Sequence, residues 1–156
     1  MRSMVSVLAA LALAALAACS SPSSSSKAVP ADQARALLVD RNWLDRMPET
    51  DRDRLHVYRF VPSMGSSGVF QDRTLFKGTF ELFSFAVSGD DLRFTLHETK
   101  QEVTSQFTIE RVDGPAPFDL KLTIPGDPRG PHVYYGIRSE TDRDGQKLQQ
   151  RLSSVR

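Results

Sequence analysis

Polar and apolar residues alternate along most of the chain after residue 54, and this period of two is typical of β-strands with one buried face. The segment 92–97 shows the pattern clearly, because Leu92, Phe94 and Leu96 would share one face of a strand and polar residues the other. Segments of this kind, each bounded by turn residues, cover 55–61, 69–76, 79–87, 92–98, 103–112, 118–125 and 132–138. They predict seven strands, or eight if Trp43 opens one.

The connections between these segments indicate how the strands pair. Residues 88–91, with the sequence Ser-Gly-Asp-Asp, predict a tight hairpin, because glycine and aspartate tolerate the positive φ of such turns. The stretches 113–117 and 126–131 predict longer connections. Every connection is too short for a crossover helix, so consecutive strands should pair antiparallel. We therefore predict an all-β fold, an antiparallel up-and-down meander that closes into a barrel of about seven or eight strands.

Two segments have a helical period instead. Residues 31–40 predict a short N-terminal helix with Ala34, Leu37 and Leu38 on one face, which would dock on one end of the domain. Residues 148–155 have apolar side chains at helical spacing and predict a weak C-terminal helix.

The segment 79–87 is unusual because both of its faces carry apolar side chains. Phe80 and Leu82 would lie on one face, and Phe83 and Phe85 on the other. The outer face is therefore expected to be covered, either by the N-terminal helix or by the C-terminal segment.

The first residues have the layout of an export signal: a positive residue, an apolar run and small residues before a cysteine. The apolar segment 5–18 would span about 21 Å as a helix, too short for a hydrocarbon core of about 30 Å. Residues 16–19, with the sequence Leu-Ala-Ala-Cys, resemble the lipobox of bacterial lipoproteins. The resemblance implies cleavage before Cys19, attachment of lipid such as palmitate to its thiol, and, with Ser20 following, an outer-membrane address. The alternative is an ordinary cleavable signal peptide with an incidental cysteine.

These features predict a division of the chain into three parts. Residues 1–18 would be the cleaved signal peptide, 19–30 the lipidated cysteine with a serine-rich tether, and 31–156 a single β-domain. The tether would reach from the membrane to the domain. The lipid on Cys19 would therefore fix where the protein works, at the bacterial cell envelope.

Composition narrows the range of partners. The chain has 20 basic and 19 acidic side chains, so it lacks the excess of positive charge that is typical of nucleic-acid-binding proteins. We therefore expect no nucleic-acid partner. With one cysteine there is no disulfide, and stability must come from burial. The sequence does not define an oligomeric state.

No motif predicts catalysis, a metal or a cofactor. His56, His97 and His132 lie on different predicted strands without a second ligand at metal spacing. Residues 142–145 resemble part of a calcium loop, but Arg151 stands where a bidentate carboxylate is required. No serine sits in a nucleophile-elbow pattern. We therefore expect no catalytic residues, no metal site and no cofactor, and a protein that is not an enzyme.

The order of elements resembles a small calycin, in particular the lipocalin-like barrels found among bacterial lipoproteins. The resemblance covers about residues 31–155 and rests on a short helix, Trp43 ahead of the strands, a run of hairpins, Arg138 at the end of the last strand and a helical tail. It implies that Trp43 and Arg138 pack together through a cation–π contact. Arg41 departs from the family pattern, which has glycine there. The alternative is that Trp43 is core and Arg138 is surface.

These observations lead to two main hypotheses of function. In the first, a lipid-anchored envelope binding module holds a small apolar or amphipathic ligand in or at the mouth of the barrel. All nine phenylalanines lie between Phe60 and Phe118, however, and they could fill the interior completely. In that case the protein would be an assembly or accessory factor that contacts an envelope protein through its outer surface. A third, weaker idea is a hydrolase on the same barrel. The sequence does not identify the ligand-binding residues.

Overall fold

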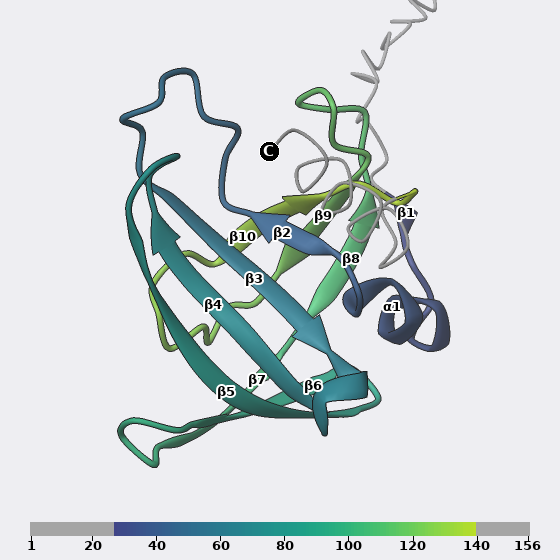
Figure 1. The fold of residues 1–156 in the computed structure, drawn as a ribbon. Helices are drawn as coiled ribbons and strands as arrows, with labels where there is room; N and C mark the ends of the chain where they lie inside the picture. Colours follow the sequence, from purple (N-terminus) through teal and green to yellow (C-terminus); the bar gives the residue numbers. More distant parts are fainter. Residues whose placement is uncertain (1–26, 140–156) are drawn as a thin grey trace, which may run out of the picture.

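Residues 27–139 are described by the computed structural model, and all of their strands belong to one antiparallel sheet (Figure 1). The predicted signal peptide, Cys19 and the predicted C-terminal helix lie outside the described residues. The described elements are β1 (Lys27–Ala28), α1 (Ala31–Leu38), β2 (Asn42–Leu44), β3 (Leu55–Val61), the 3-10 turn η1 (Pro62–Met64), β4 (Ser67–Arg73), β5 (Gly78–Ser88), β6 (Asp91–Leu96), β7 (Glu102–Gln106), β8 (Thr108–Arg111), β9 (Leu120–Thr123) and β10 (Val133–Gly136).

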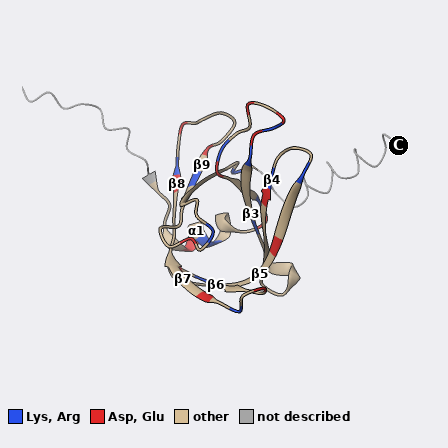
Figure 2. Cartoon of the chain, turned by 90° about the vertical axis from the view of Figure 1, so that its left-hand side faces the viewer, with Lys and Arg blue, Asp and Glu red and all other residues tan. Residues whose placement is uncertain are grey.

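The strand order shows how the sheet curves into a barrel. It runs β1-β8-β9-β10-β2-β3-β4-β5-β6-β7, so that β2 to β7 form one meander, β8 to β10 form another, and β10 joins the two by pairing with β2. Only Phe107 separates β7 from β8 along the chain, and the sheet therefore comes back on itself as a nearly closed ring (Figure 2). The prediction of an antiparallel, mostly meandering all-β fold is confirmed, with the barrel nearly closed. The predicted number of seven or eight strands is wrong, because the sheet of residues 27–139 has ten: β1 adds a strand, and the segment 103–112 forms two.

One predicted strand, 103–112, is wrong, because the structure divides it at Phe107. Its first half, β7, pairs with β6, whereas its second half, β8, pairs with β9. The chain turns a corner at Phe107, whose N–H donates to the carbonyl of Asp90 at 2.8 Å and whose ring is buried. A straight strand would not reach both neighbours, so this bend brings the ring close to closure.

Two local predictions are confirmed. Ser88 pairs with Asp91 across a two-residue turn in which Gly89 has a φ of 62°, a conformation that glycine adopts without steric cost. Trp43 does lie in a strand, the central residue of β2.

Helix α1 lies at one end of the barrel, across the opening of the ring (Figure 2). It contacts β8 and buries Ala34 and Leu38 in the hydrophobic core. The indole N–H of Trp43 donates to the carbonyl of Leu38 at 2.9 Å and fixes the end of the helix. The expectation that this helix covers the outer face of the segment 79–87 is therefore wrong. The alternative cover, the C-terminal segment, lies outside the described residues.

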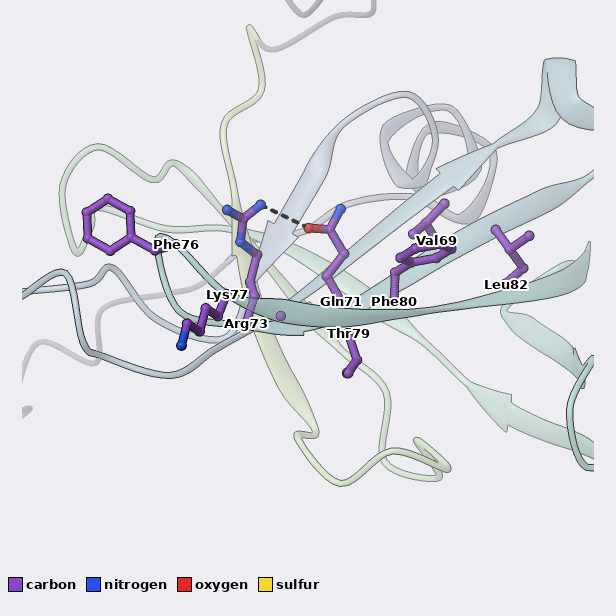
Figure 3. Close-up of a pocket in the computed structure, with 9 residues that line it drawn as sticks. Val69, Gln71, Arg73, Phe76, Lys77, Thr79, Phe80 and Leu82 are labelled. Atoms are coloured by element: carbon purple, nitrogen blue, oxygen red, sulfur yellow. Dashed lines mark hydrogen bonds between the residues drawn. The ribbon is translucent and has the colours of Figure 1, made fainter.

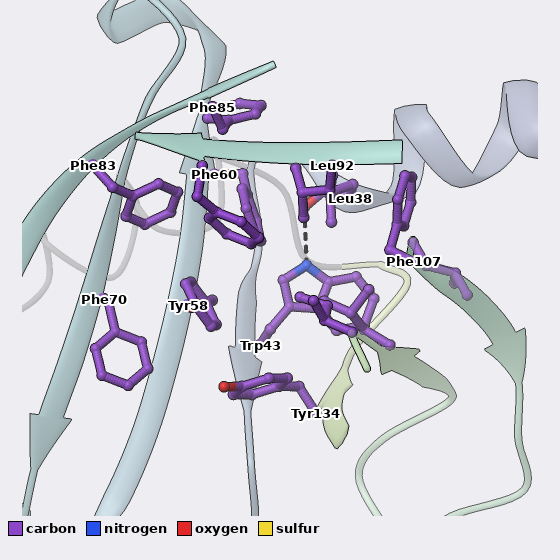
Figure 4. Close-up of a cluster of buried hydrophobic side chains, with 14 of the residues drawn as sticks. Leu38, Trp43, Tyr58, Phe60, Phe70, Phe83, Phe85, Leu92, Phe107 and Tyr134 are labelled. Atoms are coloured by element: carbon purple, nitrogen blue, oxygen red, sulfur yellow. Dashed lines mark hydrogen bonds between the residues drawn. The ribbon is translucent and has the colours of Figure 1, made fainter. Parts of the chain in front are cut away.

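Aromatic rings fill the middle of the barrel (Figure 4). Tyr58 and Phe60 come from β3, Phe83 from β5 and Phe94 from β6, and all four side chains are fully buried. Their ring centroids lie 5.4 Å apart for Tyr58 and Phe60, and 5.6 Å apart for both Phe60–Phe83 and Phe83–Phe94. These are contact distances for aromatic pairs, so side chains occupy this part of the interior.

Gly68 provides a direct test of this packing. It lies on β4 against Phe83, and a Cβ atom there would be 2.2 Å from Cζ of that ring. We expect Gly68→Ala to lower the free energy of unfolding by about 1 to 3 kcal/mol through overpacking, measured by urea denaturation. In a Phe83→Leu background the same substitution should cost less, since leucine has no atom at the position of Cζ. An equal cost in both backgrounds would contradict the proposed contact.

Candidate functional site

A buried polar cluster closes the other end of the barrel, and we call it the mouth network: Tyr58, Glu81, Asp127, Arg129 and Tyr134. The connection between β9 and β10, residues 124–132, brings Asp127 and Arg129 to this end. The carboxylate of Asp127 accepts a hydrogen bond from the Tyr58 hydroxyl at 2.8 Å, another from the Tyr134 hydroxyl, and a third from the Arg129 backbone N–H at 2.8 Å. These bonds fasten the connection to β3 and β10.

The side chain of Arg129 makes the remaining contacts of the mouth network. Its side chain is only 5% exposed, and its Nε and Nη2 donate to the two oxygens of Glu81 at 3.0 and 2.8 Å. Its Nη1 donates to the Tyr58 hydroxyl at 3.1 Å. The guanidinium carbon also lies 5.6, 5.0 and 4.9 Å from the ring centroids of Tyr58, Phe70 and Phe83. Arg129 therefore combines a bidentate ion pair with contacts to three aromatic rings.

Burial dominates the electrostatics of this cluster. It raises the pKa of Tyr58 and of Tyr134 far above the ordinary value, and the negative charge of Asp127 raises both further. Burial also raises the pKa of Asp127, although the hydrogen bonds that it accepts act in the opposite direction. For Arg129 burial alone would lower the pKa, but Tyr58 and Glu81 outweigh it and the pKa is raised. Both phenols thus keep their protons, and the guanidinium stays charged.

Further out, a second layer of polar side chains surrounds the mouth. Asp45 accepts one hydrogen bond from the backbone N–H of His56 at 2.9 Å, and its other carboxylate oxygen lies 2.8 Å from the ring nitrogen Nδ1 of His56. Arg54 donates two hydrogen bonds to Asp72, which lower the pKa of that carboxyl. The His56 ring stacks on Phe70 at 5.9 Å. Among residues 27–139, no three histidine, cysteine or acidic side chains converge in a way that could hold a metal ion.

The other two histidines lie elsewhere. His132 is exposed in the β9–β10 connection. His97 follows β6 on the outer surface, where its Nε2 lies 2.8 Å from the hydroxyl of Ser84. A hydroxyl bonded to an imidazole is the first part of a nucleophilic triad, but within the described range no carboxylate bonds to His97 to orient it. The pair therefore links β5 to the end of β6.

A second candidate site is the outer surface of the hairpin formed by β4 and β5 (Figure 3). Five apolar side chains on and beside the hairpin define what we call the β4–β5 face: Val69, Leu75, Phe76, Phe80 and Leu82. Phe76 is 75% exposed and Phe80 is 71% exposed. Both side chains line a groove of about 430 Å³, together with Val69, Leu82 and residues of the hairpin turn. The register pairs Val69 with Leu82 and Gln71 with Phe80, which aligns these side chains on one surface.

Basic side chains border the β4–β5 face. The guanidinium of Arg73 donates to the carbonyls of Thr74 and Leu75 at 3.0 and 2.9 Å, and to Gln71 at 3.2 Å, which orders the turn of the hairpin. Lys77 is exposed at the same turn. Arg73 and Lys77 also line a second hollow of about 390 Å³ toward the mouth, which the ion pair of Arg54 and Asp72 borders. The hairpin is thus apolar on its outer face and basic at its turn.

The predicted packing pair of Trp43 and Arg138 stays a prediction. Trp43 is fully buried, whereas the Arg138 side chain is 58% exposed and lies near Asp119, which accepts its backbone N–H at 2.6 Å. Arg41 is buried and donates to the carbonyls of Ile137 and Arg138 at 3.0 and 3.1 Å. Arg41 therefore ties the start of β2 to the end of β10.

Sequence reasoning did not find the mouth network. Its one local signal is the segment 126–131, Gly-Asp-Pro-Arg-Gly-Pro, in which two charged residues stand inside a glycine- and proline-rich connection. Such a composition predicts a turn, and it does not indicate that both charged side chains point inward.

Comparisons with known proteins find no match for this chain, whether among family descriptions, curated proteins or solved structures. Helix α1, the one α-helix within residues 27–139, is neither long nor apolar enough to cross a membrane. Any functional conclusion therefore has to come from the geometry of the barrel itself.

The mouth network predicts a steep loss of stability at high pH. Tyr58 and Tyr134 keep their protons in the folded protein, whereas a tyrosine in the unfolded chain ionises near pH 10. Their contribution is therefore complete below about pH 10, and above it falls by about 1.4 kcal/mol per pH unit for each tyrosine. Tyr134→Phe should reduce that slope by one tyrosine's share, measured by urea denaturation from about pH 9 to about pH 11. Identical slopes for the two proteins would show that Tyr134 ionises normally when folded.

Proposed function

We propose that the protein is a lipid-anchored binding module of the bacterial envelope, built on a lipocalin-like barrel, which binds its ligand on the outside of the barrel. In this proposal lipid on Cys19 holds the chain at the outer membrane, and the β4–β5 face takes up a small amphipathic molecule with an acidic group. The exposure of Phe76 and Phe80 beside a groove is the observation that carries the proposal.

The apolar side chains support a binding role because soluble proteins rarely leave several large ones exposed together. Phe80 and Leu82 point outward from β5, and Phe76 extends from the turn beyond them (Figure 3). The groove of about 430 Å³ that they line falls within the usual range for sites that hold small molecules.

The charges indicate which kind of molecule would fit. Arg73 and Lys77 lie at the turn, at one end of the groove that Phe80 and Leu82 line. A ligand with an apolar tail and a negatively charged group would place the tail along these side chains and the charge beside the two cations. Such molecules are available at a membrane surface, which agrees with the predicted lipid anchor.

The packing of the interior supports an outer site over an inner one. Tyr58, Phe60, Phe83 and Phe94 contact one another in the middle of the barrel, and Arg129 lies across its mouth. An apolar ligand inside would have to displace these rings or the ion pair of Arg129. An assembly or accessory factor would use the same outer face, but the volume of the groove favours a small amphiphile.

Binding of laurate should depend on the β4–β5 face. Isothermal titration of the full chain with Cys19→Ser, which removes the lipid, should show saturable binding. Phe80→Ser should weaken it by a factor of about 10 to 150, since burying a phenylalanine contributes about 1.5 to 3 kcal/mol. Ala86→Ser, an exposed position on the same face of β5, is the matched control and should leave the affinity unchanged.

A second experiment tests whether the negative charge of the ligand contributes to binding. Lys77→Glu should weaken binding of laurate but not of dodecyl maltoside, a neutral amphiphile with the same tail length. The proposal is wrong if laurate does not bind, or if it binds equally to the parent chain, Phe80→Ser and Lys77→Glu.

A further inference from the structure

The mouth of the barrel contains an aromatic cage that is distinct from the β4–β5 face. Tyr58, Phe70 and Phe83 surround the guanidinium of Arg129, with ring centroids 5.6, 5.0 and 4.9 Å from its central carbon. Aromatic cages of this kind bind organic cations, because the electron-rich faces of the rings attract positive charge.

The polar groups of the cage match the shape of a guanidinium. Glu81 accepts two hydrogen bonds from Nε and Nη2 of Arg129, and the Tyr58 hydroxyl accepts a third from Nη1 at 3.1 Å. A planar, forked donor can satisfy these acceptors together, whereas the compact ammonium group of a lysine cannot.

The cage is built by the sheet and not by the segment that carries its occupant. Tyr58 on β3 pairs with Phe70 on β4, and Phe70 pairs with Glu81 on β5, so that these three residues lie in one line across adjacent strands. Phe83 follows two residues after Glu81 on the same face of β5. Arg129 arrives from the β9–β10 connection, which contributes only the cation.

We propose that Tyr58, Phe70, Glu81 and Phe83 form a binding site for a guanidinium-bearing molecule, and that Arg129 is its built-in occupant. A ligand with a guanidinium group reaches the site by displacing the Arg129 side chain, while the hydrogen bonds of Asp127 to Tyr58 and Tyr134 keep the connection in place. Glu81 lies at the solvent edge of the cage, with its side chain 24% exposed, and provides the point of entry for the ligand.

Chemical rescue of Arg129→Ala tests this site. The variant removes the guanidinium but leaves the rings and the carboxylate, so the full chain should lose thermal stability. Ethylguanidinium at millimolar concentration should then raise its melting temperature saturably, because a ligand that binds only the folded state stabilises it. Ethylammonium should have less effect, and the double variant Arg129→Ala with Glu81→Gln should not respond.

Arg54→Ala is the matched control. Arg54 also donates two hydrogen bonds to a carboxylate, that of Asp72, but its side chain is 70% exposed. Ethylguanidinium should raise the melting temperature of this variant no more than it raises that of the wild type. An equal response of Arg54→Ala and Arg129→Ala, or no response of either, would overturn the proposal.

If Arg129→Ala does not fold, an NMR titration of the wild-type chain tests the guanidinium site instead. The Nε–H of Arg129 donates to Glu81, and its proton resonance reports directly on that bond. Ethylguanidinium should shift or remove this resonance saturably, at concentrations where ethylammonium leaves it unchanged. A resonance that responds to neither cation, or equally to both, would contradict the site.

Discussion

Arg129 closes the mouth of the barrel, and this closure keeps water out of the aromatic interior. The interior consists of aromatic rings, and their burial is stabilising only if water is excluded from both ends. Helix α1 lies across one end, and the mouth network closes the other. Taking a guanidinium and two carboxylates out of water costs several kcal/mol, which only good geometry offsets. The bidentate bond to Glu81, the two phenols on Asp127 and the three rings around Arg129 supply that geometry.

Because the interior of the barrel is filled, apolar side chains on the outer face of a strand stay at the surface. A strand in a barrel can bury only one face, and β5 gives its inner face to Phe83 and Phe85. Phe80 and Leu82 then point outward, where no other element of residues 27–139 covers them. The proposed binding surface is thus a consequence of placing apolar residues on both faces of one strand. The same strand carries Glu81, so β5 contributes to both candidate sites.

Much of the fold could be predicted from the sequence, because alternation is a local property. The strand around Leu92, Phe94 and Leu96 and the turn at Gly89 follow from neighbouring residues alone. The division at Phe107 could not be predicted, since it depends on which strands lie on either side of residues 103–112. The mouth network could not be predicted either, because Arg129 is separated from Glu81 by 48 residues and from Tyr58 by 71. Nothing in a glycine- and proline-rich connection indicates that its arginine ends inside a barrel.

We propose that the protein binds its ligand outside a filled barrel, and the methyl groups of valine and leucine can report on this directly. Val69 and Leu82 lie on the outer β4–β5 face, whereas Leu92, Leu120 and Leu122 are fully buried inside. In a methyl NMR titration with laurate, we predict that the resonances of Val69 and Leu82 shift saturably while those of the three inner leucines stay in place. Shifts confined to the inner leucines would place the ligand in the interior and contradict the claim.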